Sequence, residues 1–203
     1  MEFTEVLRRR RMVRNYTAEP IEPGALERVA RAALRAPSAG YSQGLAVVVV
    51  TDADIRREVA EAAGESEYVA RGFDPWVSRA PALIVLSVSE AAYHRRYRLP
   101  DKVDDQGREI EWPIPYWWVD AGAGLMALLL AAVDEGLAAG FLGAHSTDEL
   151  RSILDIPAEY APIGIITLGH PAPDRRSGSL DRGPRPLEEV VHRERWGGPN
   201  PAV

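Results

Sequence analysis

Continuous apolar runs alternate along this chain with segments in which apolar residues recur at helical spacing. Between Leu26 and Leu34 they return on one face of a predicted helix over 23–35, which Pro37 terminates. The next apolar run, 45–51, is continuous and rich in β-branched residues. Such a run is typical of a strand that is buried on both faces.

The same two patterns predict the remaining elements. We expect further helices over 2–11, from Asp52 or Asp54 to about Ala63, over 119–135 and over 147–154, and further strands over 82–88, 138–143 and 163–168. Because helices and strands alternate, the chain is predicted to form a three-layer α/β or α+β domain.

Two segments break this alternation. Residues 90–118 are rich in charged and aromatic side chains and contain three prolines, which is typical of a functional loop or lid. From His170 onward the chain is rich in Pro, Gly and Arg, so residues 170–203 are expected to form an arm outside the core. With no repeat and no interdomain linker, residues 1–203 are predicted to be one domain.

Composition narrows the classes of function. A net charge of −6 disfavours general nucleic-acid binding, and the absence of cysteine excludes disulfides and thiolate metal ligands. The polar, acidic N-terminus is unlike a secretory signal, and the longest apolar run, 121–133, is shorter than a membrane span. We expect a cytoplasmic protein with no membrane and no nucleic-acid partner.

Several familiar catalytic patterns are missing or lack their context. Residues 122–127 match the dinucleotide pattern G-x-G-x-x-A, but no strand precedes them, so their small residues are better explained by close helix packing. The four histidines lack metal-ligand spacing, and no G-x-S-x-G elbow is present. The sequence therefore predicts no metal site and gives no support to a hydrolase triad.

Two N-terminal features point to a ligand. Arginines crowd 8–14, and a turn of small residues, 36–43, directly precedes the first strand. Arginine forks suit phosphate, and a turn of small residues lets backbone amides approach a flat polar ligand closely. Since the 24 basic residues include a single lysine, arginine is the default cation here, and we assign Arg8 and Arg9 to plain surface. The combination predicts a phosphorylated aromatic cofactor.

Four segments in order give a resemblance to a known family. They are R-R-M-V-R-N-Y at 10–16, A-P-S-A-G-Y-S-Q-G-L at 36–45, the stretches 134–143 and 150–157, and R-P-L-E-E-V-V at 185–191. The chain resembles the nitroreductase-like flavoproteins almost from end to end.

The resemblance implies an α+β fold of three α/β/α layers, in which helices flank a central mixed sheet. It also implies an extended C-terminal arm and an intertwined homodimer with FMN at the subunit interface. The cofactor-binding residues expected by this analogy are Arg10, Arg11, Met12, Arg14, Pro37, Ser38, Ala39, Gly40, Gln43, Leu142, Gly143, Ala144, Arg182 and Arg185.

Two residues depart from the family pattern, and a cluster of aromatic residues adds candidates for substrate binding. Met12 stands where many members carry a hydroxyl residue, and Tyr41 stands where they carry asparagine. Aromatic residues of 112–118 either stack a planar substrate or form a satellite hydrophobic cluster. The candidate substrate-binding residues are Tyr41, Trp112, Tyr116, Trp117 and Trp118.

The activity that the resemblance implies is FMN-dependent NAD(P)H oxidation. In a ping-pong cycle, hydride passes through flavin N5 to an electron-poor acceptor such as a nitroaromatic, a quinone or an activated alkene. The cofactor carries the chemistry, and the protein supplies position and electrostatics. The alternatives are a specialised flavin enzyme (a dehalogenase, a biosynthetic oxidase or a flavin-fragmenting synthase) or a non-catalytic FMN-binding protein.

Overall fold

A four-stranded antiparallel sheet forms the centre of the protein, in the order β1-β2-β4-β3. The computed structural model describes residues 1–143 and 147–198. The strands are β1 (Leu45–Val50), β2 (Ala82–Val88), β3 (Ala138–Gly143) and β4 (Ala161–Gly169). Within the described residues the parallel component of the expected mixed sheet is reduced to an isolated bridge between Met12 and Ala139 at the β3 edge. Antiparallel pairing joins all four strands.

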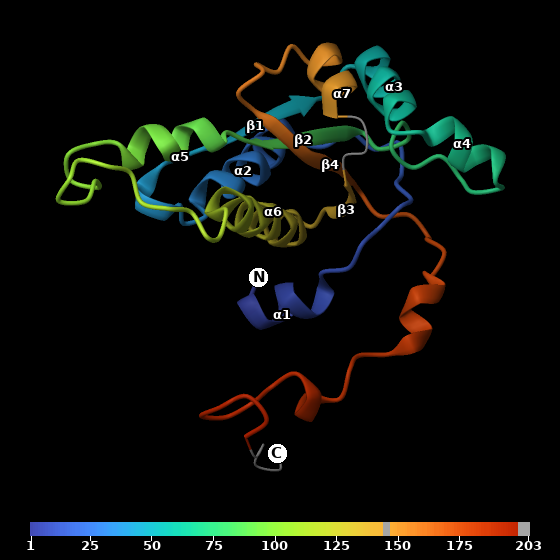
Figure 1. The fold of residues 1–203 in the computed structure, drawn as a ribbon. Coiled ribbons are helices and arrows are strands. Elements are labelled where there is room, and N and C mark those ends of the chain that lie inside the picture. Colours follow the sequence, from blue (N-terminus) through green and yellow to red (C-terminus); the bar gives the residue numbers. More distant parts are fainter. Residues whose placement is uncertain (144–146, 199–203) are drawn as a thin grey trace.

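Helices cover both faces of the sheet and give the expected three layers (Figure 1). On one face lie α2 (Pro23–Ala32) and α6 (Tyr116–Asp134), which pack with Ile84, Ile166 and Leu168. On the other face lie α3 (Ala53–Ala62) and α7 (Thr147–Ile153), which pack with Leu83, Val85 and Ile165. Strand side chains alternate between the two faces, so β2 and β4 feed both cores and are almost entirely buried.

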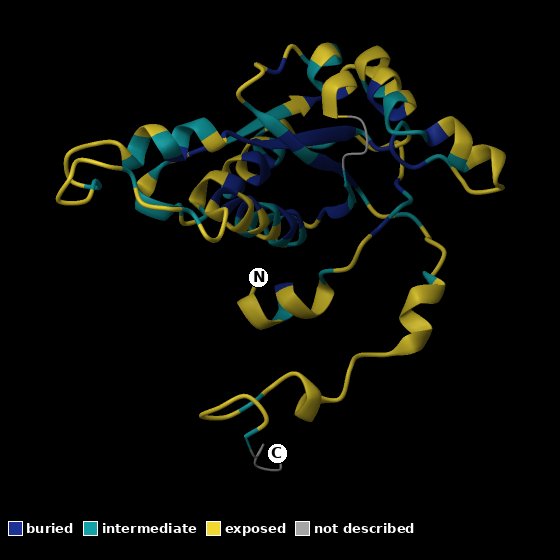
Figure 2. Ribbon diagram, viewed as in Figure 1, coloured by how far each residue is buried: buried dark blue, intermediate teal, exposed yellow. Residues whose placement is uncertain are grey.

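Three helices lie beyond this core. They are α1 (Phe3–Arg9), α4 (Glu65–Ala70) and α5 (Glu90–Tyr97). Figures 1 and 2 show that α1 and the C-terminal arm extend below the sheet with most of their residues exposed. The arm carries two 3₁₀ turns, Gly178–Arg182 and Leu187–Glu189, and is exposed over nearly all of its described length.

The segment 90–118 is more ordered than the sequence predicts. Its first eight residues form α5, capped by Ser89, whose side chain accepts a hydrogen bond from the Ala92 amide. Its last three residues belong to α6. The intervening residues form a projecting loop, seen at the left of Figure 1, and a lid function for it stays a prediction.

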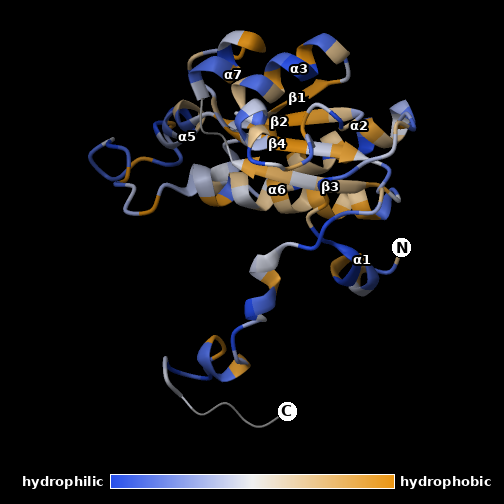
Figure 3. Cartoon of the chain, turned by 90° about the vertical axis from the view of Figure 1, so that its right-hand side faces the viewer, coloured by the Kyte–Doolittle hydropathy of each residue, from blue (hydrophilic) through white to orange (hydrophobic). Residues whose placement is uncertain are grey.

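Helix α6 is longer than the apolar run that predicts it. It has 19 residues and begins at Tyr116, so by length and composition it would suffice to cross a membrane. Seven of its residues are nevertheless buried against the domain, including the acidic Asp120. Figure 3 shows α6 as an apolar layer lying against the equally apolar sheet. This is the arrangement of a core helix.

Candidate active site

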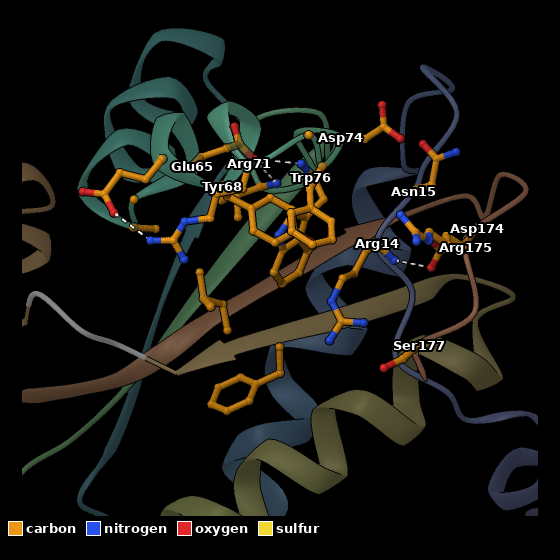
Figure 4. A pocket seen from close by; sticks show the side chains of 18 of the residues that line it. Arg14, Asn15, Glu65, Tyr68, Arg71, Asp74, Trp76, Asp174, Arg175 and Ser177 are labelled. Atoms are coloured by element: carbon orange, nitrogen blue, oxygen red, sulfur yellow. Dashed lines mark hydrogen bonds and ion pairs between the residues drawn. The ribbon is translucent and has the colours of Figure 1, made fainter. Parts of the chain in front are cut away.

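A cavity of about 800 Å³ opens where four segments meet. They are the N-terminal segment at Arg14, α4 with the turn before it and the loop after it, the end of β3 at Leu142, and the start of the arm near Arg175. Figure 4 shows Arg14 extending into this space, with Tyr68 and Trp76 forming part of its aromatic wall. Basic and aromatic side chains thus meet in one hollow.

The segment that carries Arg14 is fixed to the sheet by its neighbours. The Val13 amide donates to the Ala139 carbonyl at 3.0 Å, and the buried Tyr16 hydroxyl bonds the Val13 carbonyl and Thr167 Oγ1, both at 2.6 Å. Burial raises the pKa of Tyr16, so its phenol keeps the proton needed for these bonds. The N-terminal segment can pass this close to β3 because residue 140 is a glycine. A Cβ at that position would lie 2.5 Å from the Val13 carbonyl oxygen.

The beginning of the arm is bound to the same segment. The Arg14 amide donates to the Asp174 carboxylate at 2.7 Å, and the Asn15 side chain donates to the Pro173 carbonyl at 2.7 Å. In return, the Ala172 amide donates to the Asn15 carbonyl at 3.1 Å. These contacts place the start of the arm along the cavity while the rest of the arm leaves the domain (Figure 1).

The arginines of 8–14 fall into two groups. Arg8 donates two hydrogen bonds to Glu5, both at 2.8 Å, and Arg9 donates one at 2.5 Å; these hydrogen bonds lower the Glu5 pKa to about 2. The side chains of Arg10, Arg11 and Arg14, by contrast, have no hydrogen-bond or ion-pair partner among the described residues. The three arginines expected to bind phosphate are therefore the ones whose charge is left free.

The Arg14 guanidinium lies over an aromatic ring. Its central carbon is 5.4 Å from the centroid of Trp76, a cation–π arrangement that leaves its N–H groups available to a ligand. Tyr68 and Phe73 stack beside it with centroids 4.5 Å apart and planes 17° from parallel. All three rings line the cavity.

A buried carboxylate holds this aromatic loop in place. Glu65 is 8% exposed and accepts hydrogen bonds from the amides of Trp76 at 2.7 Å and Val77 at 2.6 Å, which closes the loop between α4 and β2. Sequence analysis missed both Glu65 and the aromatic wall that includes Trp76. The signal that could have revealed them was the grouping of aromatic residues directly before a predicted strand.

The small-residue turn lies elsewhere. It packs beside α5, where Arg96 Nε donates to the Gly40 carbonyl at 2.8 Å, whereas the cavity lies beside α4. Figure 1 shows α5 and α4 at opposite sides of the molecule. One chain therefore does not bring 37–43 to the Arg14 cavity.

The remaining predicted cofactor residues are distributed along the cavity side and the arm. Met12 is exposed at the β3 edge, Gly143 follows Leu142 at the end of β3, and Ala144 lies outside the described residues. Arg182 and Arg185 lie farther along the exposed arm. Of the predicted set, Arg14 and Leu142 line the cavity directly.

The aromatic residues of 112–118 divide by burial. Trp117 is 7% exposed and packs with Trp112 and Tyr93, and the Trp112 indole also donates to Glu109 at 2.7 Å. Tyr116 and Trp118 are exposed, as is Tyr41. In this chain Trp112 and Trp117 thus pack in a satellite cluster, and the role of all five residues in substrate binding stays a prediction.

Comparison with known proteins identifies the family to which this fold belongs. The family model "Nitroreductase family" matches residues 7–170, and the chain belongs to that family. An FMN reductase [NAD(P)H] from Bacillus subtilis is 29% identical over 201 residues, which cover 96% of this chain and 74% of the relative. An iodotyrosine deiodinase from Nematostella vectensis is 26% identical, covering 94% of this chain and 74% of the relative.

A solved structure agrees with these relatives. The NADPH:FMN oxidoreductase from Vibrio harveyi, complexed with NAD⁺, superposes with a TM-score of 0.72 at 26% identity. The match covers 98% of this chain and 79% of the other. The expected nitroreductase-like fold is confirmed.

Proposed function

We propose that this protein is an FMN-dependent NAD(P)H oxidoreductase that works as a homodimer. The observation that carries the proposal is the guanidinium of Arg14, which has no hydrogen-bond or ion-pair partner in the described part of the chain and extends into an aromatic-walled cavity of about 800 Å³. The relatives support the choice of cofactor, because one is named an FMN reductase and a similar structure is an NADPH:FMN oxidoreductase.

The residues present fit FMN chemically. A phosphate needs charge-assisted donors, and a flat ring system needs an apolar wall. Within the cavity Arg14 offers the donors, and Tyr68 and Trp76 offer the wall. Arg10 and Arg11, earlier on the same N-terminal segment, are proposed to add to the phosphate contacts. Arg182 and Arg185 of the arm are proposed to join the phosphate contacts. Leu142, Gly143 and Ala144 would border the flavin ring.

A second copy of the chain would complete the site. The turn 37–43 and the cavity lie apart in one chain, so the turn of one subunit would meet the cavity of its partner. Apolar side chains that a lone chain leaves uncovered support this arrangement. They lie on α1, on the outer face of α6 and on the arm, and include Phe3, Leu7, Trp118, Val119, Met126, Leu187 and Val190, all 45–65% exposed.

The chemistry that bound FMN would supply is hydride transfer between NAD(P)H and an electron-poor acceptor such as a nitroaromatic, a quinone or an activated alkene. The chain's own contribution would be to bind the phosphate, to stack the flat ring and to keep water from it. We propose no side chain as an obligate acid or base. Tyr41 and the aromatic residues of 112–118 stay our candidates for the contact with the acceptor.

The test begins with the purified protein, which should be yellow and show the two visible absorption bands of flavin. Mixing it anaerobically with NADPH or NADH should bleach these bands. Nitroaromatic, quinone, activated-alkene and iodotyrosine acceptors should then be compared for their ability to restore the colour. Protein that is colourless and binds no added FMN would overturn the proposal, and flavin that neither nicotinamide reduces would indicate a non-catalytic FMN-binding protein.

A further inference from the structure

The turn 37–43 is held in an unusual backbone conformation. Gly40, Tyr41 and Gln43 all have positive φ, at 62°, 59° and 52°. Glycine adopts this region freely, but tyrosine and glutamine do so only where the surroundings fix them. Tyr41 is itself 76% exposed, so other residues in and around the turn must stabilise this conformation.

A buried carboxylate supports the turn from one side. Asp120, on α6, is 7% exposed, and its Oδ2 accepts from the Ala39 amide at 2.8 Å and from the Tyr93 hydroxyl at 2.8 Å. Burial, and then the nearby Asp120, raise the pKa of Tyr93, so that phenol remains a donor. Asp120 Oδ2 thus accepts from two donors, one of which is the turn itself.

A guanidinium binds the turn one residue farther on, at Gly40. Arg96, on α5, donates from Nε to the Gly40 carbonyl at 2.8 Å. Its other two nitrogens form a fork on Asp101, at 2.8 and 2.6 Å, which fixes the direction of the side chain. The two residues Ala39 and Gly40 are consequently held by two different helices.

Neighbouring packing leaves little room for another conformation. A Cβ on Gly40 would lie 2.6 Å from the Tyr97 ring, and a Cβ on Gly44 would lie 2.5 Å from the Tyr93 ring. Both rings belong to α5. Helix α5 is therefore a rigid support for the turn, although the sequence suggests a loop at this position.

We propose that Asp120 and Arg96 are positioning residues that hold the turn 37–43 in its left-handed conformation. This inference rests on the proposed function, in which the turn meets the flavin of the neighbouring subunit. Neither residue needs to touch the cofactor, since Asp120 acts through the Ala39 amide and Arg96 through the Gly40 carbonyl. A preformed turn spares the ligand the entropy of ordering it.

The experiment is amide hydrogen exchange in the FMN-free protein, followed by mass spectrometry of a peptide spanning 36–44. Asp120→Ala should speed exchange of this peptide roughly tenfold, because a buried hydrogen bond is lost, and should weaken FMN binding by a similar factor. Asp120→Asn should restore most of both properties, because its amide oxygen can still accept from Ala39. Peptides from β2 and β4 report any global loss of stability.

Arg96→Met tests the second grip without opening the core. It should speed exchange of the 36–44 peptide and weaken FMN binding in the same direction. Its matched control is Arg95→Met on the same helix, because Arg95 pairs with Glu159 instead of the turn. That control should leave both measurements unchanged.

The inference is overturned if the peptide exchanges at the wild-type rate in both Asp120→Ala and Arg96→Met, or if Arg95→Met speeds it equally. It is also overturned if exchange rises in the 36–44 peptide while FMN affinity stays at the wild-type value. A wild-type protein that binds no FMN would instead remove the proposed function, and the exchange data would still show whether the two residues hold the turn.

Discussion

Two ends of this molecule are expected to contact one cofactor. They differ in how many of the groups at each end already have partners within a single chain. At the α5 end, the turn 37–43 is bonded to Asp120 and Arg96, and its conformation is settled by its own chain. At the α4 end, Arg14 extends into an open cavity without a hydrogen-bond or ion-pair partner among the described residues, and the arm leaves the domain (Figures 1 and 4).

The difference suggests a division of labour within the proposed dimer. One end offers fixed backbone groups, which supply shape, and the other offers unpaired cations, which supply binding energy for an anion. A cofactor placed between the two ends would contact the rigid turn of one subunit, and its phosphate would neutralise the arginines of the other. The predictions below test each side of this contrast.

The largest effect is expected from separating the two ends. Val119→Glu combined with Met126→Glu places two carboxylates on the exposed apolar face of α6, where the proposed partner packs. Burying them uncompensated costs several kcal/mol in all, so we expect a monomer that has lost its FMN. Light scattering coupled to size-exclusion chromatography, with flavin absorbance, measures both.

The matched control for this pair is Ile55→Glu, an exposed apolar position on α3 that is remote from α6 and the arm. It should leave the dimer intact. A double variant that remains a yellow dimer would show that α6 does not form the interface.

A smaller effect is expected when the cationic end alone is weakened. Arg14→Ala removes one charge-assisted contact to phosphate, worth about 1.5–3 kcal/mol, so the Kd for FMN should rise about ten- to 150-fold. Flavin fluorescence quenching measures the affinity directly.

Arg9→Ala is the control for that substitution, because Arg9 pairs with Glu5 and has no assigned ligand contact. We expect its FMN affinity to match that of the wild type. Equal losses in both variants would mean that general positive charge, and not the free guanidinium in the cavity, attracts the cofactor.

The smallest effect concerns the projecting loop beside the turn end. A hydrogen bond to Glu109 raises the pKa of His94 above its ordinary value of 6.5 and ties this loop to α5. Because the folded pKa is the higher one, this stabilisation is complete below the unfolded value and is lost as pH rises through the folded value. The free energy of unfolding should therefore fall over that interval.

Urea unfolding followed by tryptophan fluorescence from about pH 5 to about pH 9 would measure this dependence. His94→Gln should remove it, and the stability difference between the two proteins should shrink as pH rises. A difference that is constant across the range would contradict the assignment to His94.

Sequence patterns were sufficient to predict the helices and strands that bury a regularly spaced set of apolar residues in the core. The bounds predicted for β2 and β3 agree with the structure, because both runs are largely apolar. Strand β4 begins two residues early, at Ala161, since Pro162 is accommodated opposite Ser87 where the register shifts. Helices α4 and α5 were missed, because each buries a single residue, Glu65 or Tyr93, and so shows no apolar stripe.

The candidate site was predictable in its charge and not in its shape. The resemblance selects Arg10, Arg11 and Arg14 from the cluster, and these side chains have no hydrogen-bond or ion-pair partner in residues 1–143 and 147–198. Their binding of phosphate stays a prediction. The aromatic wall could not be predicted from the sequence, because it depends on the hydrogen bonds from Trp76 and Val77 to Glu65, which close the loop after α4. Nor does a linear pattern show that the turn 37–43 depends on Asp120, a residue about eighty positions away.

Gly140 carries no functional group, yet the reach of Arg14 into the cavity depends on it. Any side chain at this position would meet the Val13 carbonyl, the Thr167 hydroxyl and the Trp76 ring, all within 3 Å of its Cβ. Even alanine would push the N-terminal segment away from the sheet and disturb the ring beneath the guanidinium at once. In a survey of variants, this position would be classed with the ligand-binding residues by its intolerance, although its contribution is the space that it leaves empty.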